Sequence, residues 1–171
     1  MTIAPKSSLV GLEETPAGQT KAQFLECLRL IERLHRRLLD VVKMRLEETG
    51  RTDINSVQAL LLYNIGDNEM TAGELRTRGY YLGSNVSYNL KKLVEMGYIS
   101  HERSPHDRRS VRISLSDAGR VVKNLVEGLL DEQLSDILGG GHMSAGDLET
   151  LRDALRRLDR YWAEQIGYAS L

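Results

Sequence analysis

The 171-residue chain contains a single cysteine, Cys27, and no long hydrophobic run. One thiol cannot form an intrachain disulfide, so a reducing compartment is expected. No apolar stretch approaches the length of about 20 residues that a membrane-spanning helix requires. The N-terminal segment lacks the apolar centre of a secretion signal, and residues 1–19 are expected to form a disordered polar arm. These absences predict a cytoplasmic protein without a membrane partner.

The sequence also lacks the patterns of catalytic and metal-binding sites. Its four histidines do not show the spacing of metal ligands. Neither a glycine-rich phosphate loop nor a nucleophile motif is present. Three glycines in a row, followed by His142, indicate a helix break rather than a site. We therefore predict that the protein is not an enzyme and that it binds no metal and no cofactor.

Acidic residues outnumber basic ones by one over the whole chain, which by itself argues against a nucleic-acid partner. The distribution of charge points the other way. Residues 71–112 contain eight Lys and Arg against four acids, whereas the remainder contains 15 basic and 20 acidic residues. A basic middle within an acidic frame is what a localised anion-binding face would show.

Proline and glycine are absent from residues 20–49, where apolar residues recur every three or four positions. This spacing predicts one helix about 45 Å long that ends at Gly50. Such a helix is longer than a domain of this size is wide. Part of its apolar stripe is therefore expected to be covered by a second copy of the chain.

Three short helices are predicted to follow. A capping box of Asn55 and Gln58 starts the first, and a capping box of Thr71 and Glu74 starts the second. The third covers residues 84–96. Tight connections between the three helices are typical of a helix-turn-helix unit.

A hairpin completes this unit. Residues 111–116 alternate between apolar and polar, the period of a strand with one buried face. Ser116 is a predicted N-cap for a further helix, and Ser144 starts the last one. The predicted fold is mainly α with a small β-hairpin wing. It comprises a winged helix-turn-helix DNA-binding domain, residues 53–116, and a helical dimerisation region, residues 20–50 and 117–171.

The third short helix has two distinct faces. Its apolar side chains share one side of the helical wheel and are expected to face the core. Polar and basic side chains share the other side, where they could hydrogen-bond to base edges or neutralise phosphates. These candidates are Ser84, Asn85, Tyr88, Lys91 and Lys92, with Ser87 only marginally outward. A solvated outer face is the alternative, but the following basic hairpin favours DNA.

The hairpin tip carries Asp107, Arg108 and Arg109. Arginines on a short ribbon could reach a narrow minor groove, where negative potential is concentrated. Asp107 could accept hydrogen bonds from Arg109 and fix the direction of its side chain. A charged tip that only aids solubility is the alternative. Arg108 and Arg112 are assigned to backbone contacts or solvent.

The residues Asp107-x-Arg109, followed by VRISLSDAG, resemble the D-x-R-x5-L-T-x-x-G signature of the MarR family of transcriptional regulators. VSYNLKKLVEMGYISHE is similar to the recognition helix and first wing strand of that family. The resemblance covers residues 20–165, with Ser116 in place of the commoner threonine. ELRTRGYYLGSNVSYNLKKL further resembles the LdtR-like alphaproteobacterial branch.

The resemblance implies a homodimer that binds double-stranded DNA at a pseudo-palindromic operator and is more often a repressor than an activator. Each recognition helix would enter a major groove, and each Arg109 an adjacent minor groove. It also implies a small-molecule effector, commonly an aromatic or phenolic acid, in a crevice where Arg45 and Tyr63 are candidates.

Two alternatives stay open. Some relatives in the family sense oxidants through a cysteine on the first helix, where Cys27 lies. No histidine or lysine is placed to activate this thiol, so a buried, unreactive side chain is favoured. A winged helix that binds another protein instead of DNA is the other alternative, and Tyr88 with its neighbouring lysines argues against it.

Overall fold

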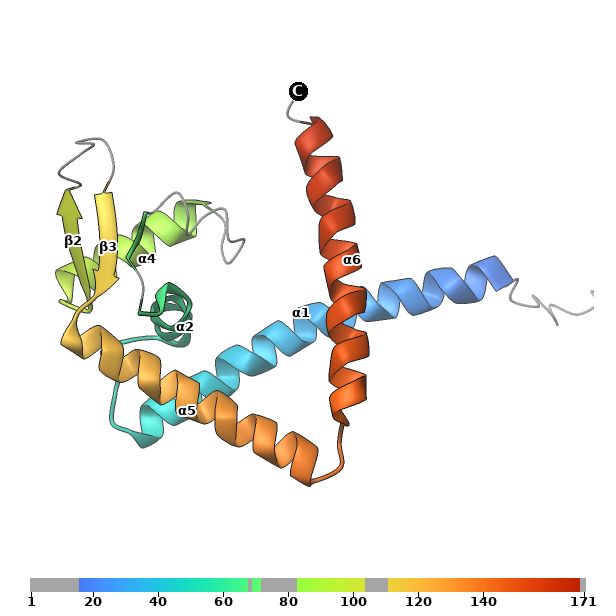
Figure 1. Cartoon of the computed structure of the whole chain (residues 1–171), viewed down its shortest axis with the longest axis horizontal. Helices are drawn as coiled ribbons and strands as arrows, with labels where there is room; N and C mark the ends of the chain where they lie inside the picture. The colour runs from blue at the N-terminus through green and yellow to red at the C-terminus, as the bar shows by residue number, and fades with distance from the viewer. Residues whose placement is uncertain (1–15, 68, 72–82, 104–110, 170–171) are drawn as a thin grey trace, which may run out of the picture.

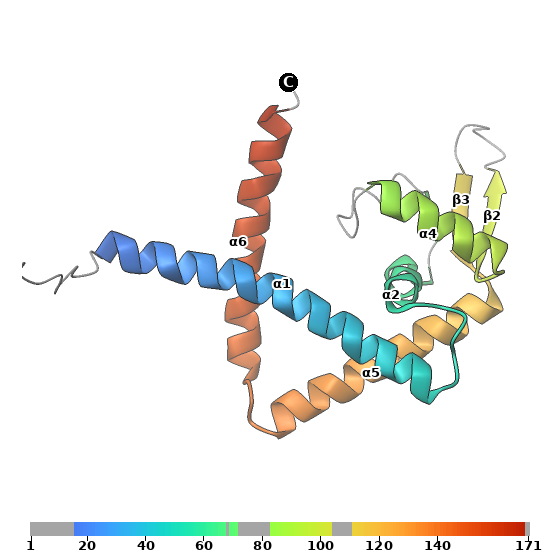
Figure 2. The same ribbon diagram turned by 180° about the vertical axis from the view of Figure 1, so that it is seen from behind.

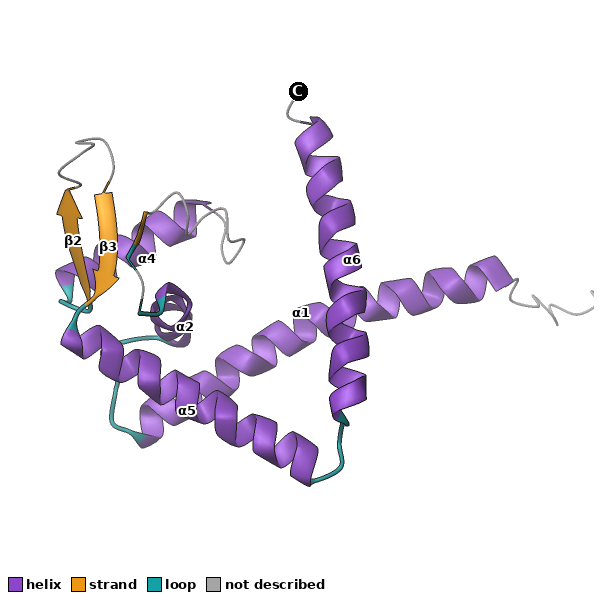
Figure 3. Ribbon diagram, viewed as in Figure 1, coloured by secondary structure: helices purple, strands orange, loops and turns teal. Residues whose placement is uncertain are grey.

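The computed structural model describes residues 16–67, 69–71, 83–103 and 111–169. Helices dominate this part of the chain, and three short strands complete it (Figures 1 and 3). In chain order the elements are α1 (Pro16–Glu48), α2 (Ser56–Ile65), β1 (Met70–Thr71), α4 (Gly83–Glu95), β2 (Ile99–Arg103), β3 (Val111–Leu115), α5 (Asp117–Gly139) and α6 (Ala145–Ala169). The mainly α fold with a small β wing is confirmed.

Helix α1 is 33 residues long, which corresponds to about 50 Å. It begins four residues earlier than predicted, at Pro16, because proline is well tolerated in the first turn of a helix. It ends where predicted, since Gly50 adopts a φ of 69° that favours glycine. Only the second half of α1 contributes to the hydrophobic core, through Val42 and Leu46.

The predicted capping box of α2 is confirmed. The Gln58 backbone N–H donates to the Asn55 side chain at 2.9 Å, and the Asn55 N–H donates to the Gln58 side chain at 3.1 Å. These two bonds satisfy donors that the start of a helix leaves free. The helix stops at Gly66, which has a φ of 65°. The second predicted box, at Thr71 and Glu74, reaches into residues outside those described.

The core lies where α2 meets α5, the C-terminal half of α1, α4 and the sheet. Its largest fully buried side chains come from each of these helices: Leu61, Leu62, Ile65, Leu93, Val42, Val122 and Val126. Figure 1 shows α2, α4 and the strands gathered into one lobe, from which α1 and α5 extend. We call α2, α4 and the sheet, which fall within the DNA-binding domain predicted from the sequence, the DNA-binding lobe.

The sheet has three antiparallel strands in the order β1–β3–β2. Strand β2 pairs with β3 in the register His101↔Ile113, as expected for a wing hairpin. Strand β1, which sequence reasoning missed, pairs with the other edge of β3, with Met70 opposite Ile113. A strand of two residues is too short to show an alternating pattern, so the sequence carries no signal for it.

Helices α5 and α6 start at their predicted caps. The Ser116 side chain accepts a hydrogen bond from the Gly119 N–H at 3.1 Å and caps α5. Ser144 and Asp147 bond to each other at the start of α6. The glycines after α5 end that helix, and Gly141 has a φ of 68°.

Helix α6 leaves the end of α5 at an angle and projects away from it (Figure 2). Its described side chains are exposed or half-buried, although many of them are large and apolar. The same is true of α1 from Gly18 to Arg37. The exposed apolar side chains of these two segments are Phe24, Leu25, Ile31, Leu34, Leu151, Leu155, Tyr161, Trp162 and Ile166. We call this set the frame surface.

An ion pair joins α1 to α5. The Arg45 guanidinium bonds to both carboxylate oxygens of Glu132, and one of these contacts is 3.3 Å long. The hydrogen bond from Arg45 lowers the pKa of Glu132, and the charge of Arg45 adds to this effect. Because Arg45 also contacts Glu48 at 3.4 Å, the end of α1 carries a small ionic network.

Glu132→Gln is expected to lose a modest stabilisation at neutral pH but none in acid. A carboxylate whose folded pKa is depressed stabilises fully above its ordinary pKa of 4.5. This contribution falls as the pH drops below 4.5 and disappears below the folded pKa. The difference in Tm between wild type and variant should therefore be constant from pH 7 to about pH 5 and then close. Glu164→Gln, on exposed α6, is the control and should show no such pH-dependent gap.

Candidate nucleic-acid interface

Helix α4 covers the residues that the sequence predicts to form the recognition helix. Leu93 is fully buried and Leu90 is nearly so, which anchors one face of α4 in the core. The helix ends at Glu95, and Gly97, with a φ of 77°, allows the chain to turn into the wing. The predicted inward face is therefore confirmed for these two side chains, and the opposite face is left available.

The outward face of α4 presents the predicted tyrosine and lysines to solvent. Tyr88 is 62% exposed, so most of its aromatic side chain is open to solvent. Lys91 is 77% exposed and contacts Glu95 at 3.9 Å, while Lys92 contacts the same carboxylate at 3.1 Å. The hydrogen bond to Glu95 raises the pKa of Lys92, so this ammonium group is charged at neutral pH. The Ser87 side chain is exposed as well.

Two of the predicted recognition residues are only partly described. Ser84 and Asn85 lie in the first turn of α4, as predicted, but their side chains lie outside those described. Glu95 was not among the predicted residues. Its spacing of three and four residues from the two lysines could have indicated its role, since such pairs share a helix face.

The wing consists of β2 and β3, and its tip covers residues 104–110. Asp107, Arg108 and Arg109 therefore lie outside the described residues. Arg112 lies on β3, one residue from the end that leads to the tip, and its guanidinium contacts the Glu69 carboxylate at 3.1 Å. This ion pair ties β3 to the segment before β1, and residues 43 positions apart give no local sequence signal for it.

The two predicted effector residues occupy different settings. Arg45 is held by Glu132 and Glu48, and Tyr63 is half-buried against the core. A cavity of about 270 Å³ lies at the connection from α1 to α2, and neither residue lines it. Its lining residues are Lys43, Leu46, Glu47, Arg51, Thr52, Ile54, Asn55 and Ser56.

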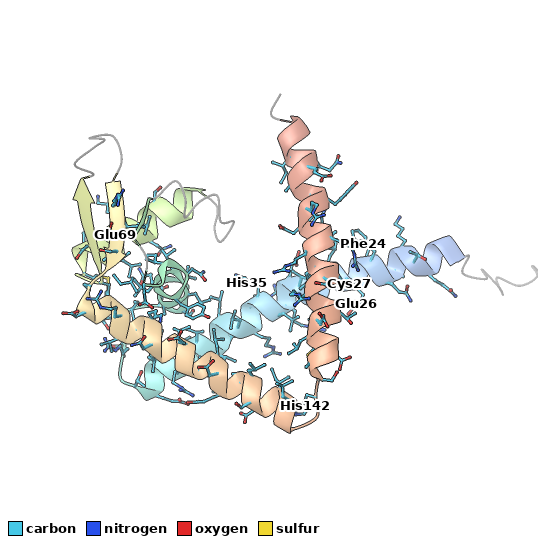
Figure 4. All side chains as sticks on the ribbon, viewed as in Figure 1. Phe24, Glu26, Cys27, His35, Glu69 and His142 are labelled. Carbon is cyan, nitrogen blue, oxygen red and sulfur yellow. The ribbon has the colours of Figure 1, made fainter. Side chains whose placement is uncertain are left out.

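Cys27 is exposed in the single chain, so the prediction of a buried thiol is wrong for one protomer. The reason is that the first half of α1 contributes nothing to the core of its own chain. Figure 4 shows Cys27 and Phe24 on this outer stretch of α1, away from the DNA-binding lobe. The two residues are three positions apart and therefore share a helix face.

Neither a metal-binding cluster nor a membrane-spanning helix lies within the described ranges. No group of three or more His, Cys, Asp or Glu side chains could hold a metal ion there. Among the described helices, none is long and apolar enough to cross a membrane.

Comparisons with known proteins identify the fold and the family. A model of the winged helix DNA-binding domain matches residues 54–119. The exopolysaccharide II synthesis transcriptional activator ExpG of Rhizobium meliloti is 37% identical over 159 residues, which cover 92% of this chain and 80% of the relative. A mutant of MarR from E. coli, solved in complex with operator DNA, has a TM-score of 0.64 at 21% identity and covers 80% of this chain and 95% of its own. The chain belongs to the MarR family of transcriptional regulators.

Two further transcriptional regulators are similar to this chain. SlyA has a TM-score of 0.67 at 19% identity, with coverage of 84% of this chain and 98% of its own. The organic hydroperoxide resistance transcriptional regulator of Bacillus subtilis is 31% identical over 109 residues, or 63% of this chain and 71% of the relative. This MarR-family chain is thus a DNA-binding transcriptional regulator, and its relatives are regulators rather than enzymes. The narrower LdtR-like assignment stays a prediction.

Proposed function

We propose that this MarR-family regulator is a homodimer that binds a pseudo-palindromic operator and responds to a small-molecule ligand. The observation that carries DNA recognition is the outward face of α4. An exposed tyrosine and two charged lysines lie there, on a helix whose other face is locked into the core. A helix held in this way can present its side chains to a major groove without first becoming ordered.

In the proposed complex, α4 of each protomer enters a major groove. Asn85, Ser87 and Tyr88, near its N-terminal half, would contact base edges, and Lys91 and Lys92 would neutralise phosphates. Arg109 would enter the adjacent minor groove from the wing. Because a dimer has two-fold symmetry, the two half-sites should be about one helical turn apart.

The frame surface supports the proposed dimer. Monomeric proteins rarely leave so many large apolar side chains exposed on two helices, and a second copy would cover them. The dimerisation region proposed from the sequence, residues 20–50 and 117–171, contains every residue of the frame surface. Residues 53–116 would then form the DNA-binding domain of each protomer.

The proposed direction of regulation is repression. A dimer bound across a promoter blocks access of the transcription machinery to the DNA. Repression therefore requires no contact with another protein, whereas activation does. The relative ExpG is named an activator, which favours the opposite direction. A reporter gene under the selected operator, with and without the regulator, distinguishes the two.

The proposed ligand is a small aromatic or phenolic acid that binds near Arg45 and Tyr63. Arg45 could pair with a carboxylate, but the ligand would have to compete with Glu132 for it. A thermal-shift screen of such acids against wild type and Arg45→Ala tests this proposal. A stabilising acid that acts equally on both proteins would move the site away from Arg45.

Selection of DNA fragments from a random library, followed by binding at several salt concentrations, tests DNA recognition. Lys91→Gln should reduce the slope of log affinity against log salt by about 1.8, because a dimer then neutralises two fewer phosphates. Lys43→Gln is a matched control, since Lys43 is 66% exposed and contacts Glu47 four residues later at 3.7 Å. Its slope should equal that of wild type. Equal slopes for all three proteins would remove Lys91 from the interface.

Oxidant sensing through Cys27 is the second candidate function. It is favoured by the exposed thiol in the single chain and by similarity to a regulator named for organic hydroperoxide resistance. We expect Cys27→Ser to bind DNA as wild type does, with and without an organic hydroperoxide, because a dimer partner would cover this face of α1. Loss of peroxide-induced release in the variant alone would establish the sensor instead.

A further inference from the structure

We propose that Tyr98 and Gly119 are positioning residues that fix the DNA-binding lobe relative to α1 and α5, two helices of the proposed dimerisation region, and so determine operator half-site spacing. The proposal rests on the proposed function, DNA binding by a homodimer. We call Asp53, Gly97, Tyr98, Ser116 and Gly119 the Tyr98 junction. These residues lie where the recognition helix, the wing, the start of α5 and the connection after α1 meet.

Tyr98 lies between the recognition helix and the wing. Its backbone N–H donates to the Leu93 carbonyl at 2.9 Å, which closes the end of α4. The next residue, Ile99, begins β2. A displacement of Tyr98 would therefore move the end of the recognition helix and the start of the wing together.

The start of α5 binds Gly97 and Tyr98, the two residues just before β2. The Ser116 hydroxyl donates to the Gly97 carbonyl at 2.7 Å, and the Ser116 N–H donates to the Tyr98 carbonyl at 3.1 Å. Ser116 is also the N-cap of α5, since its hydroxyl accepts from Gly119. The residue that caps α5 is thus also bonded to the base of the wing.

Gly119 allows this approach because it has no side chain. A Cβ atom at this position would lie 2.2 Å from the Tyr98 carbonyl oxygen and 3.2 Å from its carbon. Both are backbone atoms, so a side chain here would force the first turn of α5 and residue 98 apart. Gly128, nine residues later on the same helix, would place a Cβ with nothing within 4 Å.

The Tyr98 side chain reaches the connection between α1 and α2. Its hydroxyl donates to the Asp53 carboxylate at 2.6 Å, in the connection that follows α1. The tyrosine is only 4% exposed, and burial together with this hydrogen bond raises its pKa, so the hydroxyl stays protonated as a donor. One residue is therefore bonded to the end of the α1 connection through its side chain and to the start of α5 through its backbone.

This arrangement separates two properties of the protein. The chemistry of α4 determines how well one lobe binds one half-site. The orientation of the lobe relative to the proposed dimerisation region determines whether the two lobes of a dimer fit two half-sites at once. A change in the Tyr98 junction should therefore weaken binding to a full operator far more than binding to a half-site.

Gly119→Ala tests the proposal, with Gly128→Ala as the matched control. The probes are a duplex selected from a random library by the wild-type protein, the same duplex reduced to one half-site, and a series with altered half-site spacing. For Gly119→Ala we expect full-site affinity to fall about tenfold or more, half-site affinity to stay within about twofold, and the preferred spacing to change. Gly128→Ala should match wild type throughout. Circular dichroism and sedimentation check that each variant is folded and dimeric.

Tyr98→Phe provides a test that does not depend on tolerance of a new side chain at residue 119. It removes one hydroxyl, and exposed Asp53 can then bind water. Tyr98→Phe and Asp53→Ala should each weaken full-site binding by the same factor, and the double variant by no more than either alone. Asp53→Asn keeps an acceptor and should restore binding. If Gly119→Ala does not fold, these variants decide the question.

Equal losses on full-site and half-site DNA, or an unchanged preference for spacing, would overturn the proposal and leave the Tyr98 junction as a packing feature of the lobe. Failure of the wild-type protein to select any DNA is a different result, because it would overturn the proposed function itself.

Discussion

Glutamate in place of Leu155 is expected to convert the protein into a monomer whose affinity for a full operator falls by about a hundredfold or more. Leu155 is 42% exposed on α6 and lies on one helix face with Leu151, Trp162 and Ile166. A dimer would bury this face, and a carboxylate within it would have no partner to offset the loss of water. The monomer would keep one half-site contact and lose the second.

Thr150→Glu is the matched control for this prediction. Thr150 is also exposed on α6, but the helical period places it away from the apolar face. Both substitutions add one negative charge, so general repulsion from DNA is equal in the two variants. Sedimentation at micromolar concentration should show a monomer for Leu155→Glu only, with a wild-type circular dichroism spectrum. A dimer with wild-type affinity would remove α6 from the proposed interface.

The start and end points of the helices were largely predictable from the sequence, because caps are local. Asn55 with Gln58, and Ser116 with Gly119, act over three residues, and the glycines that end α1, α2 and α4 adopt positive φ angles. Such signals depend on the residue and its immediate neighbours. The start of α1 at Pro16 was missed because a proline at a helix start resembles one in a loop.

Whether Cys27 is buried or exposed could not be predicted from periodicity. An apolar stripe indicates that a helix face will be covered but not which chain covers it. Within one protomer, the first half of α1 is uncovered and the thiol is exposed. The same ambiguity applies to α6, whose stripe is as regular as that of a core helix.

The outward face of α4 could be predicted from the sequence, whereas the contacts that orient this helix could not. Tyr88, Lys91 and Lys92 share one side of α4 because a helix repeats every 3.6 residues. The bond from Tyr98 to Asp53 joins residues 45 positions apart, and only the folded chain brings them together. Gly119 belongs to the family-like signature. The reason that a glycine is needed there, the close approach of the Tyr98 carbonyl, is visible only in the folded structure.

Arg109→Ala is expected to weaken operator binding by about tenfold to a hundredfold without changing the stability of the fold. In the proposed complex the guanidinium enters a narrow minor groove, where negative potential is strongest, and each dimer loses two such contacts. The tip of the wing, residues 104–110, lies outside the described residues. The predicted role of Arg109 therefore depends on the family-like signature and on the position of the tip at the end of β2 and β3.

Arg108→Ala is the control, since it removes the same charge from the adjacent position. If the wing contributes only general attraction to phosphates, the two variants should lose the same affinity and the same salt dependence. If Arg109 reads the minor groove, its variant should lose more, and its preference for A·T-rich sequence beside each half-site should weaken. Asp107→Asn should produce a smaller loss of the same kind, because the amide still accepts a hydrogen bond but guides the guanidinium less strongly. Wild-type affinity for Arg109→Ala in fluorescence anisotropy would exclude Arg109 as the minor-groove contact.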